Sequence, residues 1–401
     1  MNAQGKGLEQ HEILKVQLMR GEKEQDYLTH IWNLTSMMDH PIIAKEEDQD
    51  EACYRQFYEE AISLCRQKRF HEVLEKCRYT SLDDEEEYSI DVIQPEKIEF
   101  KQNSYEDGEN SIISFPEFLL LVLDVCTGGE QPASHYQPDK LIEKFDALKT
   151  YFTAGEFYEK MLYYRLLLDY YTIRRDIKDG QGNYSLILKG PKDDSDKLKQ
   201  YQSMLYVSTE AFYNWLKPYL RKLEQDELHS CAEMLAFLKK EDNERHSILP
   251  ARKDLSYKAS GNIRYWFWRL DYYLWEQRST FFNEEEQKIV EHYVFRRNRS
   301  IEHLHPQDES HNEEWEEEAV HSFGNLAMIS QSFNSQQSND HIQIKFARIH
   351  EQISNKSLQS IKMFLMCKLA DFNYLNWTMK LTKEHENEMI EFLERSFYIS
   401  D

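Results

Sequence analysis

The sequence predicts a mainly α-helical protein, with a multi-helix body and a small unit of two strands and a helix near the C-terminus. Three observations favour this fold class. Apolar side chains recur at helical intervals, strand-like segments are few, and the 401 residues include only 12 glycines and 9 prolines. This composition excludes a fibrous or low-complexity protein. The 40% of hydrophobic residues provide for a sizeable core.

The helices of the body are predicted from caps and apolar spacing. Ser114 and Glu117 fit a capping box with Pro116 in the first turn, and the apolar run 118–123 follows. Because this run is apolar on every side, we expect its helix to lie at the centre of the core. Further helical spacing occurs in segments 141–152, 158–164 and 231–238.

The aromatic segment 263–275 has two interpretations. Its rings could form a stacking platform for flipped or single-stranded bases. They could also form a buried helix face, with Arg264 and Arg269 extending to the surface. The near-helical spacing favours the buried helix.

Strand and loop candidates are fewer. Segment 183–188 follows the turn signal at 179–182 and is expected to start a small hairpin. The acidic run 81–88 and the polar stretch 102–110 are expected to be exposed loops.

Charge, motifs and cysteine spacing together exclude several classes of protein. There are 49 Lys and Arg against 72 Asp and Glu, a net charge of −23, which argues against coating nucleic acid or membrane through bulk charge. P-loop, dinucleotide-binding and H-E-x-x-H motifs are absent, and no apolar run could span a bilayer. The six cysteines form no C-x-x-C pair, so we expect reduced thiols in a soluble, cytoplasmic protein without membrane contact.

The residues with the clearest chemistry lie between positions 296 and 345. Glu302 and His303 end a short predicted strand, the apolar run 326–329 can pair back as a second strand, and Asn334 begins a helix. In a regular strand Glu302 and His303 would face opposite sides, so a twist or bulge at Pro306 would be needed to bring them into one pocket.

This set suits the hydrolysis of a phosphodiester bond. A neutral His303 can take a proton from water, and the oxygens of Glu302 and Asn334 can hold a hard divalent cation. The amide of Asn325 can fix the orientation of the imidazole.

The motifs occur in a fixed order: Ile301-Glu302-His303, Pro306-Gln307, Trp315, Gly324-Asn325-Leu326, Asn334 and Ser338-Asn339. This order resembles an HNH (His-Me finger) nuclease, specifically the C-terminal nuclease domain of GmrSD-type modification-dependent restriction endonucleases. The resemblance implies a ββα-metal fold with His303 as general base and Asn325 orienting it. It also implies one Mg²⁺ or Mn²⁺ ion on Glu302 and Asn334.

The DNA-binding candidates are the basic residues on either side of the motif. Arg296, Arg297 and Arg299 precede the proposed base, and Lys345 falls where this family often has a basic residue. Two site residues stay open. His305 could be a second ligand, a proton relay or an exposed strand residue, of which we favour the last, and Asn339 has no assigned role. We expect His321 to pack near the hairpin and not to bind metal.

The N-terminal segment carries a second resemblance. Residues 1–15 are similar to the last segment of the ParB-like GmrS domain, whose D-G-Q-Q-R nucleotide motif does not precede them. Either a separate GmrS-like subunit supplies that half or the chain acts alone, and we favour the separate subunit. The predicted domains are this residual end (1–22), a helical domain (23–285), the HNH motif (286–350) and C-terminal helices packing on it (351–401).

The predicted function is a metal-dependent DNA endonuclease in restriction or anti-phage defence, with modified phage DNA as a candidate substrate. The alternative is a non-enzymatic subunit whose helical body binds a partner and whose nuclease motif is relict. Seven acidic residues between positions 307 and 318 would repel a phosphate backbone, so we expect this insert to restrain non-specific DNA binding.

Overall fold

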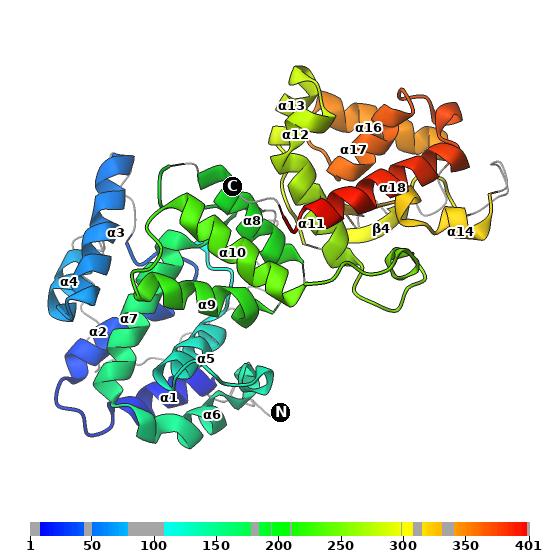
Figure 1. Ribbon diagram of the computed structural model, residues 1–401. Coiled ribbons are helices and arrows are strands. Elements are labelled where there is room, and N and C mark those ends of the chain that lie inside the picture. Colours follow the sequence, from blue (N-terminus) through cyan, green and yellow to red (C-terminus); the bar gives the residue numbers. More distant parts are fainter. Residues whose placement is uncertain are drawn as a thin grey trace, which may run out of the picture. The chain divides into compact units, whose positions relative to one another are not determined.

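The computed structural model describes residues 9–43, 50–78, 108–177, 184–193, 195–208, 211–297, 299–307, 315–330 and 341–398. They form two compact units, and each is considered by itself. Unit 1 comprises Met1–Ser195 and Ala211–Cys231, and unit 2 comprises Asp196–Glu210 and Ala232–Asp401. Both are predominantly helical, which confirms the mainly α prediction (Figure 1).

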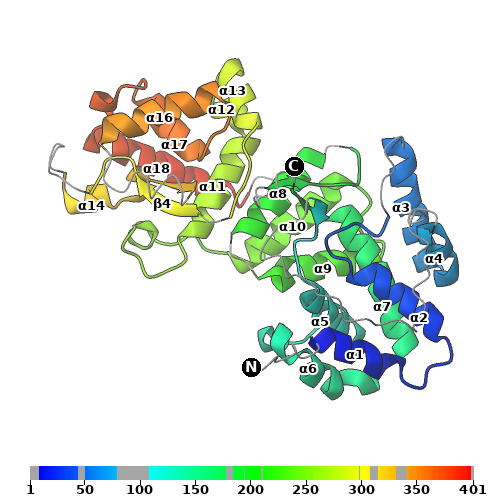
Figure 2. The same cartoon turned by 180° about the vertical axis from the view of Figure 1, so that it is seen from behind.

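Unit 1 contains eight described helices and a small sheet. The helices are α1 (Gln10–Met19), α2 (Gln25–Ser36), α3 (Glu51–Arg66), α4 (Phe70–Arg78), α5 (Phe115–Cys126), α6 (Leu141–Leu148), α7 (Ala154–Tyr171) and α9 (Phe212–Glu224), with short 3₁₀ turns η1 (Ala133–His135), η2 (Pro138–Lys140) and η3 (Lys149–Tyr151). Helix α7 packs against α2, α3, α5 and α9, and α1 lies beside α6 (Figures 1 and 2).

The predicted central helix is confirmed as α5. Ser114 caps it through a capping box with Glu117, and the side chains of 118–123 are fully buried. Helix α7 begins with a second capping box, formed by Thr153 and Glu156. Local sequence signals therefore determine where both core helices of unit 1 begin.

The sheet of unit 1 differs from the predicted one. Its antiparallel order is β1 (Gly108–Asn110), β2 (Arg174–Ile177) and β3 (Tyr184–Ile187). The described part of the predicted segment 183–188 contains β3, which pairs with the preceding strand β2 and not with a following one. The predicted loop 102–110 is a strand in its described part, because β1 pairs with a partner distant in sequence. The run 81–88 lies outside the described residues.

The helices of unit 2 pack around the aromatic segment 263–275. They are α8 (Ser195–Val207), α10 (Cys231–Arg245), α11 (Arg264–Glu276), α12 (Arg278–Phe281), α13 (Glu284–Glu291), α14 (Glu317–Val320), α16 (Ile342–Ser354), α17 (Ile361–Leu369) and α18 (Met379–Arg395), with 3₁₀ turns η4 (Arg252–Leu255), η5 (Phe323–Asn325) and η6 (Tyr374–Asn376). Strands β4 (Arg299–His303) and β5 (Leu326–Ser330) form an antiparallel hairpin.

Helix α11 is the core of unit 2. All its residues from Tyr265 to Trp275 are buried, and it packs against α17, α18 and β5. The buried-helix interpretation is therefore confirmed and the stacking platform is excluded. Arg269 is not at the surface as expected: it is fully buried and pairs with Asp242, which also accepts hydrogen bonds from Tyr201 and Tyr265.

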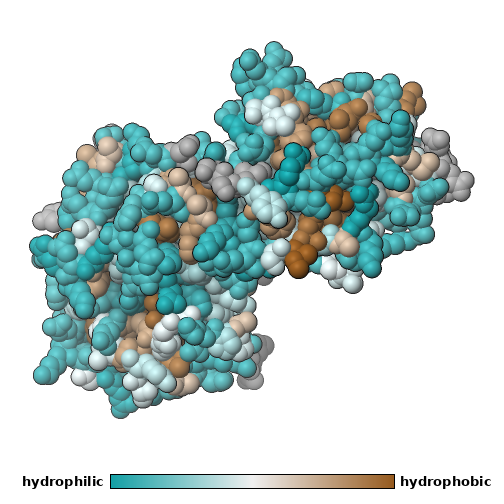
Figure 3. All heavy atoms as spheres, viewed as in Figure 1, coloured by the Kyte–Doolittle hydropathy of each residue, from teal (hydrophilic) through white to brown (hydrophobic). Residues whose placement is uncertain are grey.

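The surface is consistent with the acidic composition. The face shown in Figure 3 is mostly hydrophilic, with apolar residues in small patches. All six cysteines are free thiols. Among the described helices, none has the length and apolar character needed to cross a membrane.

Candidate functional site

The predicted strand pair is present, and its end positions the candidate residues. In the β4–β5 hairpin Glu302 is opposite Ala327 and His303 is opposite Leu326. One residue further, the amide of Leu304 donates to the carbonyl of Asn325 at 2.9 Å. Glu302 and His303 are 6% and 4% exposed, so both side chains are almost removed from water.

The imidazole of His303 lies in a cluster of polar and aromatic groups. Its Nε2 is 3.0 Å from Nδ1 of His321, and the amide nitrogen of Gln307 is 2.9 Å from its Nδ1. The ring of Tyr257 contacts it edge-on at a centroid distance of 4.5 Å. The sequence indicated that His321 packs near the hairpin, but no motif indicated Tyr257.

His303 is held in its neutral form. Burial, followed by the nearby His321 and Lys345, lowers the pKa of His303 to about 3. Burial also lowers the pKa of His321, with Lys258 contributing. At neutral pH the His303 imidazole is therefore uncharged and able to accept a proton.

Glu302 faces a buried cation. The ammonium of Lys345, on α16, lies 2.5 Å from Oε1 of Glu302 and donates to the carbonyl of His303 at 2.6 Å. Lys345 is only 4% exposed. It was expected to contact DNA phosphate, but in this position its ammonium binds the Glu302 side chain and the His303 carbonyl at the end of β4.

Asn325 determines the path of the chain after β4. Its amide nitrogen donates to the carbonyls of His305 and Val320, each at 2.9 Å, and its oxygen accepts from the amide of His305 at 2.8 Å. The indole nitrogen of Trp377 donates to the same oxygen at 3.2 Å. Both amide hydrogens and both lone pairs of this fully buried side chain are thus used, and they hold the loop that follows His303.

Residues of α17 and α18 hold the backbone on both sides of Asn325. The buried ammonium of Lys362, on α17, donates to the carbonyls of Phe323 at 2.8 Å and Leu326 at 2.6 Å. Gly324 lies so close to α18 that an added Cβ would be 2.3 Å from the carbonyl oxygen of Thr382. Neither Lys362 nor Trp377 was identified from the sequence, since both are distant in sequence from the motif.

His305 is buried, which corrects the favoured interpretation. It is 4% exposed and stacks on Trp315, with ring centroids 3.9 Å apart and planes within 4°. The expectation of an exposed strand residue is wrong, because the chain has left β4 and turned inward. The stack anchors the described end of the acidic insert against the hairpin loop.

The predicted DNA-binding arginines are in different situations. Arg296 and Arg297 are both exposed, and the guanidinium of Arg297 lies 3.9 Å over the Tyr206 ring and donates to the Tyr206 carbonyl. The backbone of Arg299 is in β4, and its side chain lies outside the described residues. Asn334 and Asn339 also lie outside them.

Of the two predicted metal ligands, Glu302 and Asn334, only Glu302 is among the described residues. The carboxylate of Glu302 is a hard oxygen ligand of the kind that Mg²⁺ prefers. A cation there would share this carboxylate with Lys345. Within the described ranges no group of three or more His, Cys, Asp or Glu side chains could hold a metal ion.

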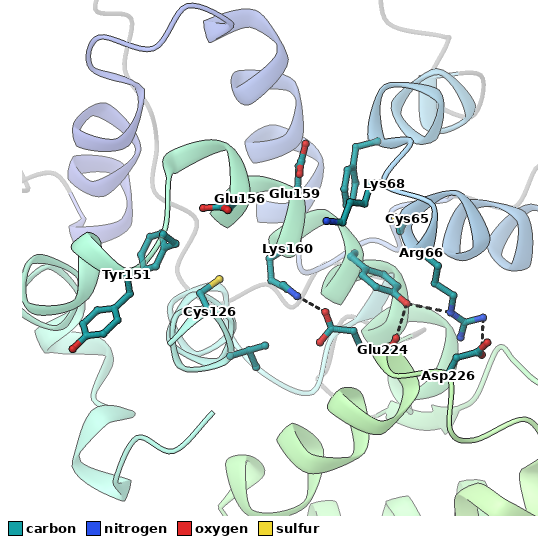
Figure 4. A pocket seen from close by; sticks show the side chains of 14 residues that line it. Cys65, Arg66, Lys68, Cys126, Tyr151, Glu156, Glu159, Lys160, Glu224 and Asp226 are labelled. Carbon is teal, nitrogen blue, oxygen red and sulfur yellow. Dashed lines mark hydrogen bonds and ion pairs between the residues drawn. The ribbon is translucent and has the colours of Figure 1, made fainter. Parts of the chain in front are cut away.

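Unit 1 has a separate pocket of about 660 Å³ (Figure 4). Lys160 pairs with Glu224 across it, and Arg66 contacts Asp226 at 2.9 Å and the hydroxyl of Tyr163 at 3.2 Å. Three basic side chains line the pocket against four acidic ones. This balance of charge does not favour the binding of a phosphate group.

Residues 240–392, which contain the whole hairpin and its support, match the family model of the C-terminal domain of GmrSD restriction endonucleases. No curated protein and no solved structure matches the chain. The part of unit 2 that carries His303 is therefore similar to the C-terminal domain of a family of restriction endonucleases.

Proposed function

We propose that unit 2 is a metal-dependent DNA endonuclease of the HNH type, with His303 as the general base. The observation that carries this proposal is the buried, neutral imidazole at the end of a hairpin that lies inside the matched region. A base with a pKa near 3 is weak. A phosphate anion bound beside it would raise that pKa, since an opposite charge favours the protonated form.

The other roles follow from the contacts. Asn325 holds the loop behind the base, and Lys345 holds Glu302 and the carbonyl of His303. One Mg²⁺ or Mn²⁺ ion would bind Glu302 and Asn334 and would neutralise the charge that develops on the phosphate.

The proposal is tested with the purified full chain and supercoiled plasmid DNA. We expect nicking in Mg²⁺ or Mn²⁺ that stops in chelator and in His303→Ala. The matched control His229→Ala removes an exposed imidazole and should cut like the wild type. Failure of the wild type to cut DNA of any modification state, with either metal, would refute the nuclease proposal and favour the non-enzymatic alternative.

Metal binding has its own measurement. Mn²⁺ titration followed by electron paramagnetic resonance should show weaker binding in Glu302→Gln than in the wild type. Equal binding in the two proteins would remove Glu302 from the proposed ligand set.

We further propose a role in restriction or anti-phage defence together with a separate ParB-like subunit. The match to a family of restriction endonucleases supports the defence role, and the resemblance of residues 1–15 to the end of a ParB-like domain supports the partner. Co-purification with a candidate subunit, and a change in the rate of cutting modified DNA when it is added, are the expected results. Unchanged cutting and no complex would contradict the partnership.

A further inference from the structure

A segment outside the nuclease motif packs against the imidazoles of the candidate site. Residues 252–258 reach the imidazole cluster at Tyr257, whose amide donates to the carbonyl of His321 at 3.0 Å. The Tyr257 ring contacts the His303 ring at 4.5 Å and stacks on the His321 ring at 5.8 Å, with planes 15° apart. This residue is therefore next to the proposed base, although it lies far from it in the sequence.

The segment is fixed at its other end as well. The guanidinium of Arg252 contacts Oε2 of Glu386 at 2.7 Å and Oδ1 of Asn387 at 2.5 Å, both on α18. Leu255 is fully buried. These anchors hold the backbone, so Tyr257 and Lys258 present their side chains at the surface from a fixed position.

Tyr257 is 43% exposed, which is unusual for a large residue whose ring packs on two histidines. One part covers the imidazoles and the other is open to solvent. A half-exposed aromatic ring beside a reactive group offers a stacking surface to a nucleotide, because every base has a π-face.

The cation beside this ring is available to an anion. Lys258 pairs with Glu317 of α14, and the two side chains are 57% and 74% exposed. Such an exposed pair contributes little to stability, so a phosphate can replace the carboxylate at small cost. In a chain of net charge −23, a lysine adjacent to the site is a specific attraction for phosphate.

We propose that segment 252–258 binds the substrate strand beside the scissile bond, with Lys258 contacting a backbone phosphate and the ring of Tyr257 packing against a nucleotide. Glu317 then acts as an internal competitor that occupies Lys258 when no DNA is bound. This inference rests on the proposed nuclease function and identifies the surface by which that site holds nucleic acid.

The test measures the binding of the full chain to a fluorescein-labelled DNA duplex by anisotropy over a series of NaCl concentrations. All proteins carry His303→Ala to prevent cutting. Lys258→Gln should weaken binding and reduce the slope of log K against log [salt] by about 1. The control Lys240→Gln removes a 72%-exposed lysine that also has a glutamate neighbour, and it should leave both quantities unchanged.

Two further variants separate binding from structure. Tyr257→Ala should weaken binding on the order of tenfold with little change in salt slope, whereas Tyr257→Phe keeps the ring and should bind like the parent. Glu317→Gln should bind more tightly, because it frees Lys258. An ion pair with only a structural role would give no such gain.

The results separate the two proposals. If Lys258→Gln, Tyr257→Ala and Glu317→Gln all bind like Lys240→Gln while the wild-type chain cuts DNA and His303→Ala does not, the surface is wrong and the nuclease proposal stands. If the unmodified chain neither binds nor cuts DNA, both are wrong.

Discussion

Replacing Lys345 by methionine should destabilise unit 2 strongly. The side chains of Lys345 and Glu302 are 3% and 8% exposed, and the ammonium is 2.5 Å from the carboxylate. Methionine has a similar length but no charge, so the buried carboxylate would lose the ammonium that balances its charge. Breaking a buried pair in this way costs about 3–5 kcal/mol. Since a whole domain is stable by only about 5–15 kcal/mol, at least about a fifth of the stability would be lost.

A double-mutant cycle measures how much of this loss in stability comes from the interaction between Lys345 and Glu302. Glu302→Gln combined with Lys345→Met leaves no buried charge, so the double variant should recover much of the loss. We expect a coupling free energy of about 2 kcal/mol between the two positions. The hydrogen bond from Lys345 to the carbonyl of His303 is lost in both the single and the double lysine variant, so it does not enter the coupling.

The assay is urea unfolding followed by tryptophan fluorescence. Five of the seven tryptophans are in unit 2, so the signal comes mainly from the unit that carries the substitution. Lys240→Met, at an exposed position, is the control and should lie within about 0.5 kcal/mol of the wild type. A coupling below about 0.5 kcal/mol, with Lys345→Met as stable as the control, would refute the buried ion pair.

Three further predictions concern the support of the site and the core. Burial lowers the pKa of Lys362 from 10.5 to about 7, so the unfolded state binds more protons between these values. The free energy of unfolding of the wild type, minus that of Lys362→Met, should therefore rise with pH above pH 7, by up to about 1.4 kcal/mol per pH unit. Urea unfolding measures this difference at each pH. A difference that does not change with pH would contradict the prediction. Gly324→Ala should lower the melting temperature because its Cβ meets backbone, whereas Gly261→Ala has open space; equal shifts would be inconsistent with the close packing on α18. Ser114→Ala should cost about 1 kcal/mol in urea unfolding through the lost cap of α5, and no change would show that the cap is dispensable.

The features predicted from the sequence are those decided by neighbours along the chain. The capping box of α5 and the buried aromatic helix α11 are local patterns, and the β4–β5 pairing brings together the strand that ends in Glu302 and His303 and the apolar run of β5. The strand β1 was missed because its three residues become a strand only by pairing with β2. Tyr257 and Trp377 were missed for the same reason, since only tertiary packing brings them to the loop after His303.

The positive charges near the motif show that sequence position does not predict which cations are available to a ligand at the surface. Lys345 lies inside the motif region, yet its charge is buried and used by Glu302. Arg297 precedes the base and is exposed, and its guanidinium is held over the Tyr206 ring. Lys258 belongs to no motif, and its side chain is exposed on the segment that contacts both imidazoles. A phosphate responds to accessible charge at short distance, because exposed charges further away are screened by salt. The net charge of −23 therefore leaves nucleic acid binding to a few exposed cations next to the site.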